Sequence, residues 1–268
     1  AANDVQLVVH SFEQVAMLEQ HAGTHRFAVW LKVDTGMNRL GFRAEEFSTA
    51  HARLQACPAV GTLRLLTHLA SAENANGLET KLQLDRLRTL SEPLRLERSI
   101  ANSAGIIAWP EAHGEWVRPG LMLYGASPFA ERSAADLGLL LAMTFATRVI
   151  AVRNVAAGEA IGYNGVWRAK RPSRIAVAAV GYGDGYPRCM HAGAPTLIKG
   201  REVSVVGRVS MDMTMLDATA LPDVAVGDEV RLWGRGLPAE RVAQFADTIA
   251  YELFCRIAER VKREEISG

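Results

Sequence analysis

The 268-residue chain has no excess of charge of either sign and no long hydrophobic run. Lysine and arginine total 30 against 29 acidic residues, so bulk charge favours neither nucleic acid nor an anionic membrane as a partner. No apolar run reaches the roughly 20 residues that a membrane span needs, and the first ten residues lack the basic start and apolar core of a signal peptide. We therefore expect a globular protein of the cytoplasm.

Cysteine is also scarce. Cys57, Cys189 and Cys255 lie far apart, with no Cys-x-x-Cys pair and no histidine at ligand spacing. An odd number of isolated cysteines is typical of a reducing compartment, and we expect neither a disulfide framework nor a metal site. The chain begins without a methionine and opens almost directly into a strand-like run, which indicates that a segment has been removed upstream.

In the first half of the chain, apolar runs alternate with segments of helical period. The runs predict strands over 6–10, 27–34, 62–70, 98–104 and 116–125, and the periodic segments predict helices over 11–22, 44–57 and 79–94. Thr80 with Gln83 is a capping-box pattern for the third helix. This alternation is typical of a parallel sheet covered by helices. About five units are too few for a complete (β/α)8 barrel, so a partial barrel and an open doubly wound sheet both remain.

From Leu139 to Trp233 the pattern changes to strands separated by glycine and proline turns. Strands are predicted within 143–155, 174–186, 195–217 and 226–234, and apolar residues at helical spacing then run from Val242 to Val261. The sequence therefore predicts two domains, an α/β domain over 1–136 and a β-rich domain with closing helices over 137–268.

Polar residues beside glycines follow several apolar runs, where α/β proteins place their sites. Individually they have structural interpretations: Lys32 with Asp34 as a surface pair, His68 as a core histidine, and Met211 as strand packing. Arg118 stands within an apolar run and needs a partner, because a buried unpaired charge is too costly to keep.

Taken in order, the motifs resemble the alanine racemase family over residues 5–262. The matching stretches are "DTGMNRLGF" (34–42), "WVRPG" (116–120) with "LYG" (123–125), "GYGDGYPR" (181–188) and "VSMDM" (209–213). The family interconverts L- and D-alanine with pyridoxal 5′-phosphate. The resemblance implies a (β/α)8 barrel followed by a β domain, with the first half of this chain as the last five barrel units, and a head-to-tail homodimer with shared active sites.

The resemblance also implies a Schiff-base lysine in an N-terminal motif that this sequence does not contain. The five lysines, Lys32, Lys81, Lys170, Lys199 and Lys262, all stand in other contexts. We therefore expect this chain to be the C-terminal portion of a longer polypeptide and to need the N-terminal segment for activity.

The resemblance assigns catalytic roles to Tyr163, His68 and Arg118. Racemisation removes the α-proton on one face and returns it on the other, and the implied pair of bases is a lysine and Tyr163 from the partner protomer. Arg118 is implied to face the pyridine nitrogen of the cofactor, where a guanidinium can only donate. The structural alternative for Arg118 is a buried ion pair.

The remaining roles implied by the resemblance concern binding. Ser103, Gly120, Leu121 and Tyr251, together with Arg118, are implied to bind the cofactor, and Arg39, Met211, Tyr182 and Asp212 the substrate or its access channel. Lys32 corresponds to a lysine that the family often carries as a carbamate. Asn164 and Leu69 stand where the family commonly has glycine and phenylalanine.

The sequence therefore predicts a racemase that supplies D-alanine for peptidoglycan or degrades it. Two alternatives stay open, namely a broad-specificity amino-acid racemase with the same machinery and a non-catalytic dimerisation or binding fragment.

Overall fold

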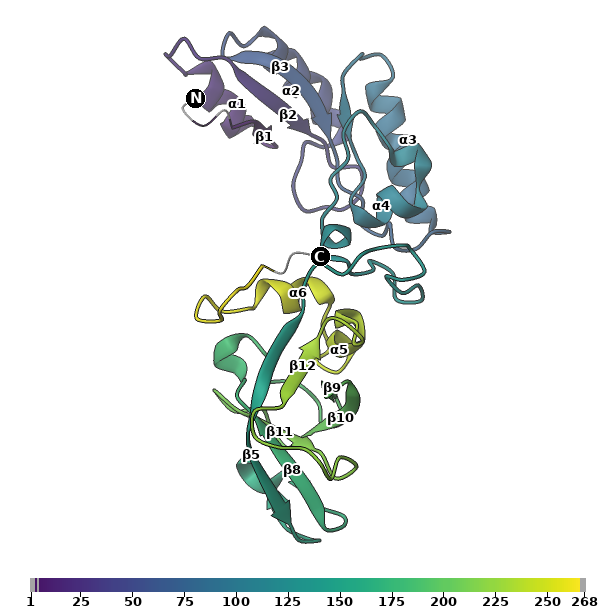
Figure 1. Cartoon of the computed structure of the whole chain (residues 1–268). Helices are drawn as coiled ribbons and strands as arrows, with labels where there is room; N and C mark the ends of the chain where they lie inside the picture. Colours follow the sequence, from purple (N-terminus) through teal and green to yellow (C-terminus); the bar gives the residue numbers. More distant parts are fainter. Residues whose placement is uncertain (1–2, 4, 266–268) are drawn as a thin grey trace. The chain divides into compact units, whose positions relative to one another are not determined.

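The computed structural model describes residue 3 and residues 5–265. The chain forms two compact units, Ala1–Gly120 and Leu121–Gly268 (Figure 1). The change of sequence pattern predicts a domain boundary between residues 136 and 137. The structural division comes earlier because Leu121 and Ala126 are buried in the core of the second unit.

The first unit is built on a parallel sheet with strands in chain order. The strands are β1 (Leu7–Val9), β2 (Phe27–Lys32), β3 (Val60–Leu66) and β4 (Arg98–Ser99), and the connecting helices are α1 (Phe12–Glu19), α2 (Ala44–Ala56) and α3 (Leu78–Ser91). The predicted parallel sheet with crossover helices is confirmed (Figure 1). Since the strands are parallel, the loops that follow β2, β3 and β4 meet at one edge of the sheet.

The predicted fifth strand, over 116–125, is wrong. Trp116 forms a single parallel bridge with Ser99, and a 3-10 helix, η2 (Leu121–Tyr124), follows. Pro119 has no N–H to donate to a ladder, which explains why pairing stops here. Trp116 is 42% exposed, so the stretch is not the buried run that its composition indicates.

The segment before it is also more helical than predicted. Of the strand predicted over 98–104, Arg98–Ser99 forms β4, and α4 (Ser103–Ala108) begins after three further residues. Asn102 is the N-cap, and its side chain accepts a hydrogen bond from the Gly105 amide at 2.9 Å. A short 3-10 helix, η1 (Pro110–Ala112), completes the turn back toward Trp116.

The second unit is a closed antiparallel barrel. Its strands close in the order β10-β11-β8-β5-β12-β9, with β5 at Phe145–Val155, β8 at Ser173–Ala178, β9 at Pro195–Ile198, β10 at Arg201–Val206, β11 at Thr214–Asp217 and β12 at Glu229–Trp233. The small pair β6 (Ala160–Ile161) and β7 (Trp167–Arg168) flanks the 3-10 helix η3 (Tyr163–Gly165), and η4 (Tyr182–Asp184) is another 3-10 helix. Closure removes the open sheet edges.

Two short helices end the chain, α5 (Ala239–Gln244) and α6 (Ala250–Cys255). The helical spacing over 242–261 is therefore interrupted, and Asp247 between them has a φ of 50° that no α-helix accommodates.

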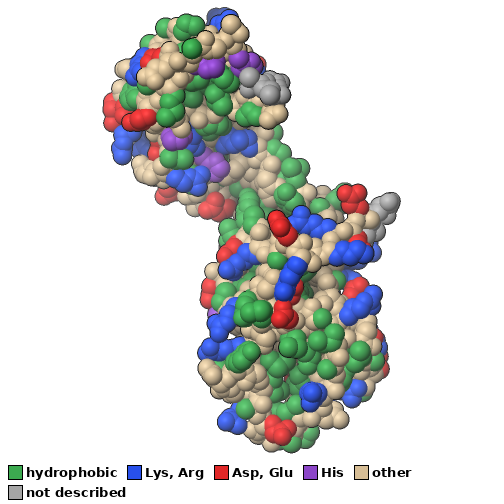
Figure 2. Space-filling model, turned by 90° about the vertical axis from the view of Figure 1, so that its left-hand side faces the viewer, with side chains coloured by type: hydrophobic (Ala, Val, Ile, Leu, Met, Phe, Trp, Pro, Cys, Tyr) green, Lys and Arg blue, Asp and Glu red, His purple; other side chains and the backbone are tan. Residues whose placement is uncertain are grey.

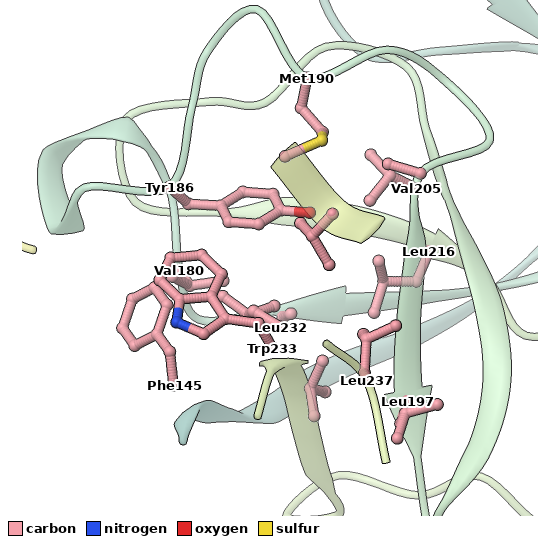
Figure 3. Close-up of a cluster of buried hydrophobic side chains, with 14 of the residues drawn as sticks. Phe145, Val180, Tyr186, Met190, Leu197, Val205, Leu216, Leu232, Trp233 and Leu237 are labelled. Atoms are coloured by element: carbon pink, nitrogen blue, oxygen red, sulfur yellow. The ribbon is translucent and has the colours of Figure 1, made fainter. Parts of the chain in front are cut away.

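Aromatic side chains fill the barrel. Trp233 packs on Phe145 with ring centroids 4.6 Å apart and is stacked with Tyr186 at 6.3 Å (Figure 3). Tyr186 is completely buried and ends the "GYGDGY" stretch, so the barrel core anchors the turn formed by η4.

The surface is mixed in charge. Figure 2 shows basic and acidic side chains interspersed with hydrophobic patches on the second unit, and histidine near basic side chains on the first. Over residue 3 and residues 5–265, no helix combines the length and the apolar character needed to cross a membrane.

Candidate active site

The loop after β2 carries the first group of predicted residues. The Asp34 carboxylate accepts hydrogen bonds from the amides of Gly36, Met37 and Asn38 at 2.9, 3.0 and 3.1 Å. This turn presents Arg39 on the exposed side of the loop. Asp34 therefore organises the loop rather than forming the surface ion pair with Lys32 that spacing alone allows.

Gly41 closes this loop against the strand end. Its φ is 128°, and a β-carbon there would lie 2.6 Å from the Asp34 nitrogen. The Phe42 amide donates to the Lys32 carbonyl at 2.9 Å, and the Asp34 amide donates to the Phe42 carbonyl at 2.9 Å. Only glycine permits so close a return of the chain.

Lys32, the last residue of β2, is 9% exposed. Burial, and then the positive charges of Arg118 and Arg39, lower the pKa of the Lys32 amine, while Asp34 partly opposes them. Burial and two cationic neighbours disfavour the charged form of the Lys32 amine, so its neutral form is more accessible than that of an exposed lysine.

His68, just after β3, and Arg118, within the stretch 116–120, lie together. The Nη2 atom of Arg118 is 3.4 Å from His68 Nδ1, and it donates to the carbonyls of Thr67 at 2.8 Å and Ile100 at 3.2 Å. The Nη1 atom donates to Ser99 Oγ at 2.6 Å. No carboxylate pairs with Arg118 among the described residues, so the structural ion pair is not formed there.

The electrostatics of this cluster are those of unbalanced positive charge. Burial, followed by Arg118, Lys32 and Arg39, lowers the pKa of His68 to about 4. Burial also lowers the pKa of Arg118 from its ordinary value. At neutral pH the imidazole is therefore uncharged, and the cluster favours an anionic or electron-rich ligand.

Ser103 and Gly120 form a second group in this unit. The Gly120 amide donates to Ser103 Oγ at 2.9 Å, which joins the start of α4 to the end of the Arg118 stretch. Ser103 is completely buried against this turn. Hydroxyl and backbone amide groups at a helix start are suited to a phosphate.

Several polar residues of this site were not predicted. Ser99 and the carbonyls of Thr67 and Ile100 hold Arg118, and buried Gln83 contacts Thr35 and the His68 carbonyl. Gln83 was predicted in a capping box, but Gly77 is the N-cap of α3 and Gln83 lies on the buried face of the helix. A polar side chain on the inward-facing helical stripe is the signal that could have identified it.

In the second unit, Tyr163 lies in η3 and its side chain is 65% exposed. The next residue, Asn164, has a φ of 59°. Glycine favours that left-handed conformation and asparagine tolerates it, which explains why asparagine can stand in place of the family's glycine.

Tyr182, Met211 and Asp212 form one group. The Tyr182 amide donates to the Ser210 carbonyl at 3.0 Å, and the Gly183 amide donates to the Met211 carbonyl at 2.9 Å. Arg260, which was not predicted, bridges the two turns by donating to Asp212 at 2.7 Å and to Asp184 at 2.8 Å.

The remaining two predicted residues, Leu121 and Tyr251, lie apart in the sequence from Tyr182, Met211 and Asp212. Leu121 is 3% exposed in the core of the second unit, and Tyr251 lies in the first turn of α6 with its side chain partly exposed. The structure therefore brings together Lys32, His68 and Arg118, then Ser103 with Gly120, and then Tyr182 with Met211 and Asp212.

Comparison with known families also divides the chain in two, with the break between residues 128 and 142. Residues 1–128 match the model "Alanine racemase, N-terminal domain", and residues 142–265 match "Alanine racemase, C-terminal domain". Alanine racemase of Nitrosococcus oceani is 48% identical over 264 residues, which cover 98% of this chain and 74% of that protein. Alanine racemase of Legionella pneumophila is 46% identical and is covered over 73% of its length.

Solved structures of alanine racemases have the same fold as this chain. The biosynthetic alanine racemase of Pseudomonas aeruginosa has a TM-score of 0.93 at 44% identity, over 96% of this chain and 72% of that one. The alanine racemase of Bartonella henselae, solved with covalently bound pyridoxal phosphate, has a TM-score of 0.88 at 28% identity, over 99% of this chain and 74% of that one. With both domain models matched and close relatives covered over about three quarters of their length, the chain belongs to the alanine racemase family.

Proposed function

We propose that this chain, when joined to the remaining quarter of the racemases that it matches, interconverts L- and D-alanine with pyridoxal phosphate, and that Lys32, His68 and Arg118 form the cofactor-facing part of its site. The observation that carries the proposal is the Arg118 guanidinium, which three oxygen acceptors and His68 hold in one orientation without any carboxylate partner among the described residues. This arrangement leaves the charge of Arg118 available to a ligand.

The residues present fit the cofactor. Nε and the second Nη1 hydrogen of Arg118 have no acceptor among the described residues, so a ring nitrogen can accept from this side chain. We propose that Ser103 and the Gly120 amide bind the phosphate, with the Gly120 amide exchanging its hydrogen bond to Ser103 Oγ for one to the phosphate, and that Tyr251 and the Leu121 amide are further phosphate ligands. When bound, pyridoxal phosphate supplies an electron-withdrawing ring that stabilises negative charge on the α-carbon.

Arg118 sets the strength of that effect. A guanidinium stays protonated and can only donate, so Arg118 leaves the ring nitrogen without a proton of its own. The three acceptors that fix Arg118 prevent it from moving away when the ligand binds. We expect the negative charge on the substrate to be short-lived, which favours racemisation over competing reactions.

Proton transfer is assigned to Tyr163 of the partner subunit, whose Oη would take or return the α-proton on one face. The resemblance implies a lysine for the opposite face. The high exposure of the Tyr163 side chain supports a role toward a second protomer rather than within its own fold. Arg39 and the Met211 amide would hold the substrate carboxylate, with Tyr182 and Asp212 on the access channel.

Lys32 is proposed as a carbamate. Its lowered pKa provides a neutral amine, which adds to carbon dioxide by forming an N–C bond and releasing one proton. The resulting anion would oppose the charges of Arg39 and Arg118. Peptide mass spectrometry under mild conditions should detect the mass of one carbon dioxide on the Lys32 peptide, lost in acid, and an unmodified peptide would contradict the assignment.

The finer architecture also belongs to the proposal. We propose that β1 to β4 are part of a (β/α)8 barrel in which residues 1–136 bind the cofactor. Residues 137–268 would contribute Tyr163 across a head-to-tail homodimer in the cytoplasm. Exposed Tyr163, Val166, Met211 and Met213 on the second unit support a partner surface there.

The test is a racemase assay in two forms, with this chain alone and with the chain joined to the part of the Nitrosococcus oceani enzyme that it does not match. We expect the joined protein to bind pyridoxal phosphate and racemise alanine, and Tyr163→Phe to lower kcat by at least ~100-fold, because general acid–base catalysis contributes about that much. Cofactor binding without racemisation would overturn the proposal in favour of a binding fragment.

Substrate breadth is tested in the same assay with serine, lysine and arginine beside alanine. Comparable kcat/KM for several of these would replace the alanine-specific assignment with a broad-specificity racemase.

A further inference from the structure

Gln83 is a fully buried polar side chain outside the predicted site. It lies on α3 and is 2% exposed. Its Nε2 donates to Thr35 Oγ1 at 3.1 Å and to the His68 carbonyl at 3.0 Å, and its Oε1 accepts from the Ala70 amide at 2.8 Å. A single amide therefore contacts both the loop after β2 and the loop after β3.

The direction of these hydrogen bonds is fixed by the groups around them. Thr67 Oγ1 donates to the Val33 carbonyl at 2.9 Å, so its oxygen is left to accept from Thr35 Oγ1 at 2.9 Å. The Thr35 hydroxyl has then used its only proton and must accept from Gln83. A chain of donors consequently runs from Gln83 through Thr35 and Thr67 to the strand end that carries Lys32.

A second contact from the same helix reinforces the first. Arg86 Nη1 donates to the Thr35 carbonyl at 2.9 Å. A β-carbon at Gly36 would lie 3.2 Å from Gln83 Cγ, so the loop after β2 rests directly on α3. The helix therefore fixes both the backbone and the side chain of Thr35.

We propose that Gln83 is a positioning residue that holds the His68 loop in register with the loop bearing Lys32 and Arg39. The proposal rests on the roles given above to His68 and Lys32, but its structural content is independent of catalysis. Thr67 and Thr35 join the two loops directly, through the hydrogen bonds from Thr67 to the Val33 carbonyl and from Thr35 to Thr67. Gln83 donates to Thr35 at the start of this chain and also holds the His68 carbonyl and the Ala70 amide.

His68 provides a reporter for this register. The charged groups that act on its imidazole are Arg118, Lys32 and Arg39, and each of them, after burial, lowers its pKa. Loosening the His68 loop would admit water and increase the distance to these cations. Both changes raise the pKa toward its ordinary value.

The experiment uses Gln83→Met, which keeps the volume and removes both donors and the acceptor. In the purified chain we expect the NMR titration of His68 to move from about 4 to ~5 or above. We also expect the amides of Gly36, Met37 and Asn38 to lose at least ~10-fold of their protection from hydrogen exchange, because Thr35 is released.

A second substitution tests the direction of the donor chain. At a pH above the pKa of the new carboxyl group, Gln83→Glu places an acceptor opposite Thr35 Oγ1 and the His68 carbonyl. We therefore expect the amides of residues 36–38 to lose the same exchange protection as in Gln83→Met. As the pH falls and the carboxyl gains a proton, one donor returns and the protection should partly recover. Gln83→Met should show no such recovery.

The controls lie on the same helix. Leu87→Ala removes a buried apolar side chain and lowers the melting temperature, and exposed Lys81→Met changes the surface; we expect both to leave the His68 titration unchanged. If Leu87→Ala moves His68 as much as Gln83→Met does, or if Gln83→Met leaves it near 4, the positioning role is wrong. None of these measurements depends on turnover. The His68 titration and the exchange protection would therefore still test the positioning role if the racemase assignment failed.

Discussion

At the scale of single residues, the site in the first unit is an uncompensated group of cations. The cations are Lys32, Arg39 and Arg118, and after burial their mutual repulsion and their effect on the neutral imidazole lower the pKa values of Lys32 and His68. A folded protein tolerates such a group where a ligand completes it, so the electrostatics are themselves an argument for an anionic cofactor or a modified lysine.

The lowered pKa of His68 makes the first unit sensitive to acid. The unfolded chain binds a proton below about 6.5 and the folded chain only below about 4. The unfolded state therefore binds more protons between these values, and stability falls as pH falls from 7 to 5, by about 1 to 2 kcal/mol after screening. Between pH 7 and pH 5, the His68→Gln variant should lose less unfolding free energy than the unchanged chain. Urea unfolding followed by resonances of the first unit measures this, and equal losses in both proteins would contradict it.

Arg118 should not be replaceable by lysine. Its guanidinium donates from two nitrogens to Ser99 Oγ and to two backbone carbonyls at once. The ammonium of a lysine has a single nitrogen and cannot span these three acceptors. We expect Arg118→Lys to cost about 2 kcal/mol of unfolding free energy and to weaken pyridoxal phosphate binding by at least ~10-fold. Exposed Arg95→Lys is the matched control, and fluorescence titration with the cofactor gives the affinity. Unchanged affinity would contradict the role of Arg118.

At the scale of elements, turns hold the proposed substrate-binding residues of the second unit. The η4 turn sits between the Ser210–Met211 backbone and the Arg256–Ile257 backbone, and Gly181 and Gly185 are its points of closest approach. Arg260 then ties the turn to Asp212. The positions of Tyr182 and Met211 are thus set by backbone contacts rather than by their own side chains.

Gly181 tests this arrangement. Its φ of −151° is extended, so the requirement is for space alone: a β-carbon would lie 2.1 Å from the Ser210 carbonyl oxygen. We expect Gly181→Ala to destabilise the barrel by about 1 to 3 kcal/mol and to remove the exchange protection of the Tyr182 amide. Gly193→Ala introduces backbone strain at a φ of 95° but no contact within 4 Å, so it should destabilise its own turn and leave the Tyr182 amide protected. Equal loss of exchange protection at the Tyr182 amide in both variants would contradict the role of Gly181.

At the scale of the whole molecule, the two units differ in how their sheets end. The barrel of the second unit has no open edge, whereas in the described sheet of the first unit β1 has an unpaired side and β4 is paired on its outer side by a single bridge to Trp116. We expect a fragment of residues 121–268 to be monomeric or dimeric and to unfold cooperatively. A fragment of residues 1–120 should self-associate through its edges. Analytical ultracentrifugation and thermal unfolding decide this, and a monomeric, cooperative 1–120 fragment would contradict it.

Much of this organisation could be predicted from local pattern. The alternation of apolar runs and helical periods predicted the parallel sheet, and the motifs around Lys32, Arg118 and Tyr182 predicted the family, because these features depend on residues close in the chain. The error over 116–125 has a local cause as well, since Pro119 stops strand pairing in a run whose composition is that of a strand.

The partners of the site residues could not be predicted in this way. Ser99 at the end of β4 and the Thr67 and Ile100 carbonyls just after β3 and β4 meet Arg118 from distant parts of the chain. Gln83 reaches Thr35 across 48 residues, and Arg260 reaches Asp184 across 76. The sequence determined the elements and the chemistry of the individual side chains, since propensity and period act over a few residues. Only the tertiary structure decided which charges are left unpaired and which loops are held together, because burial and long-range hydrogen bonding arise when distant segments pack.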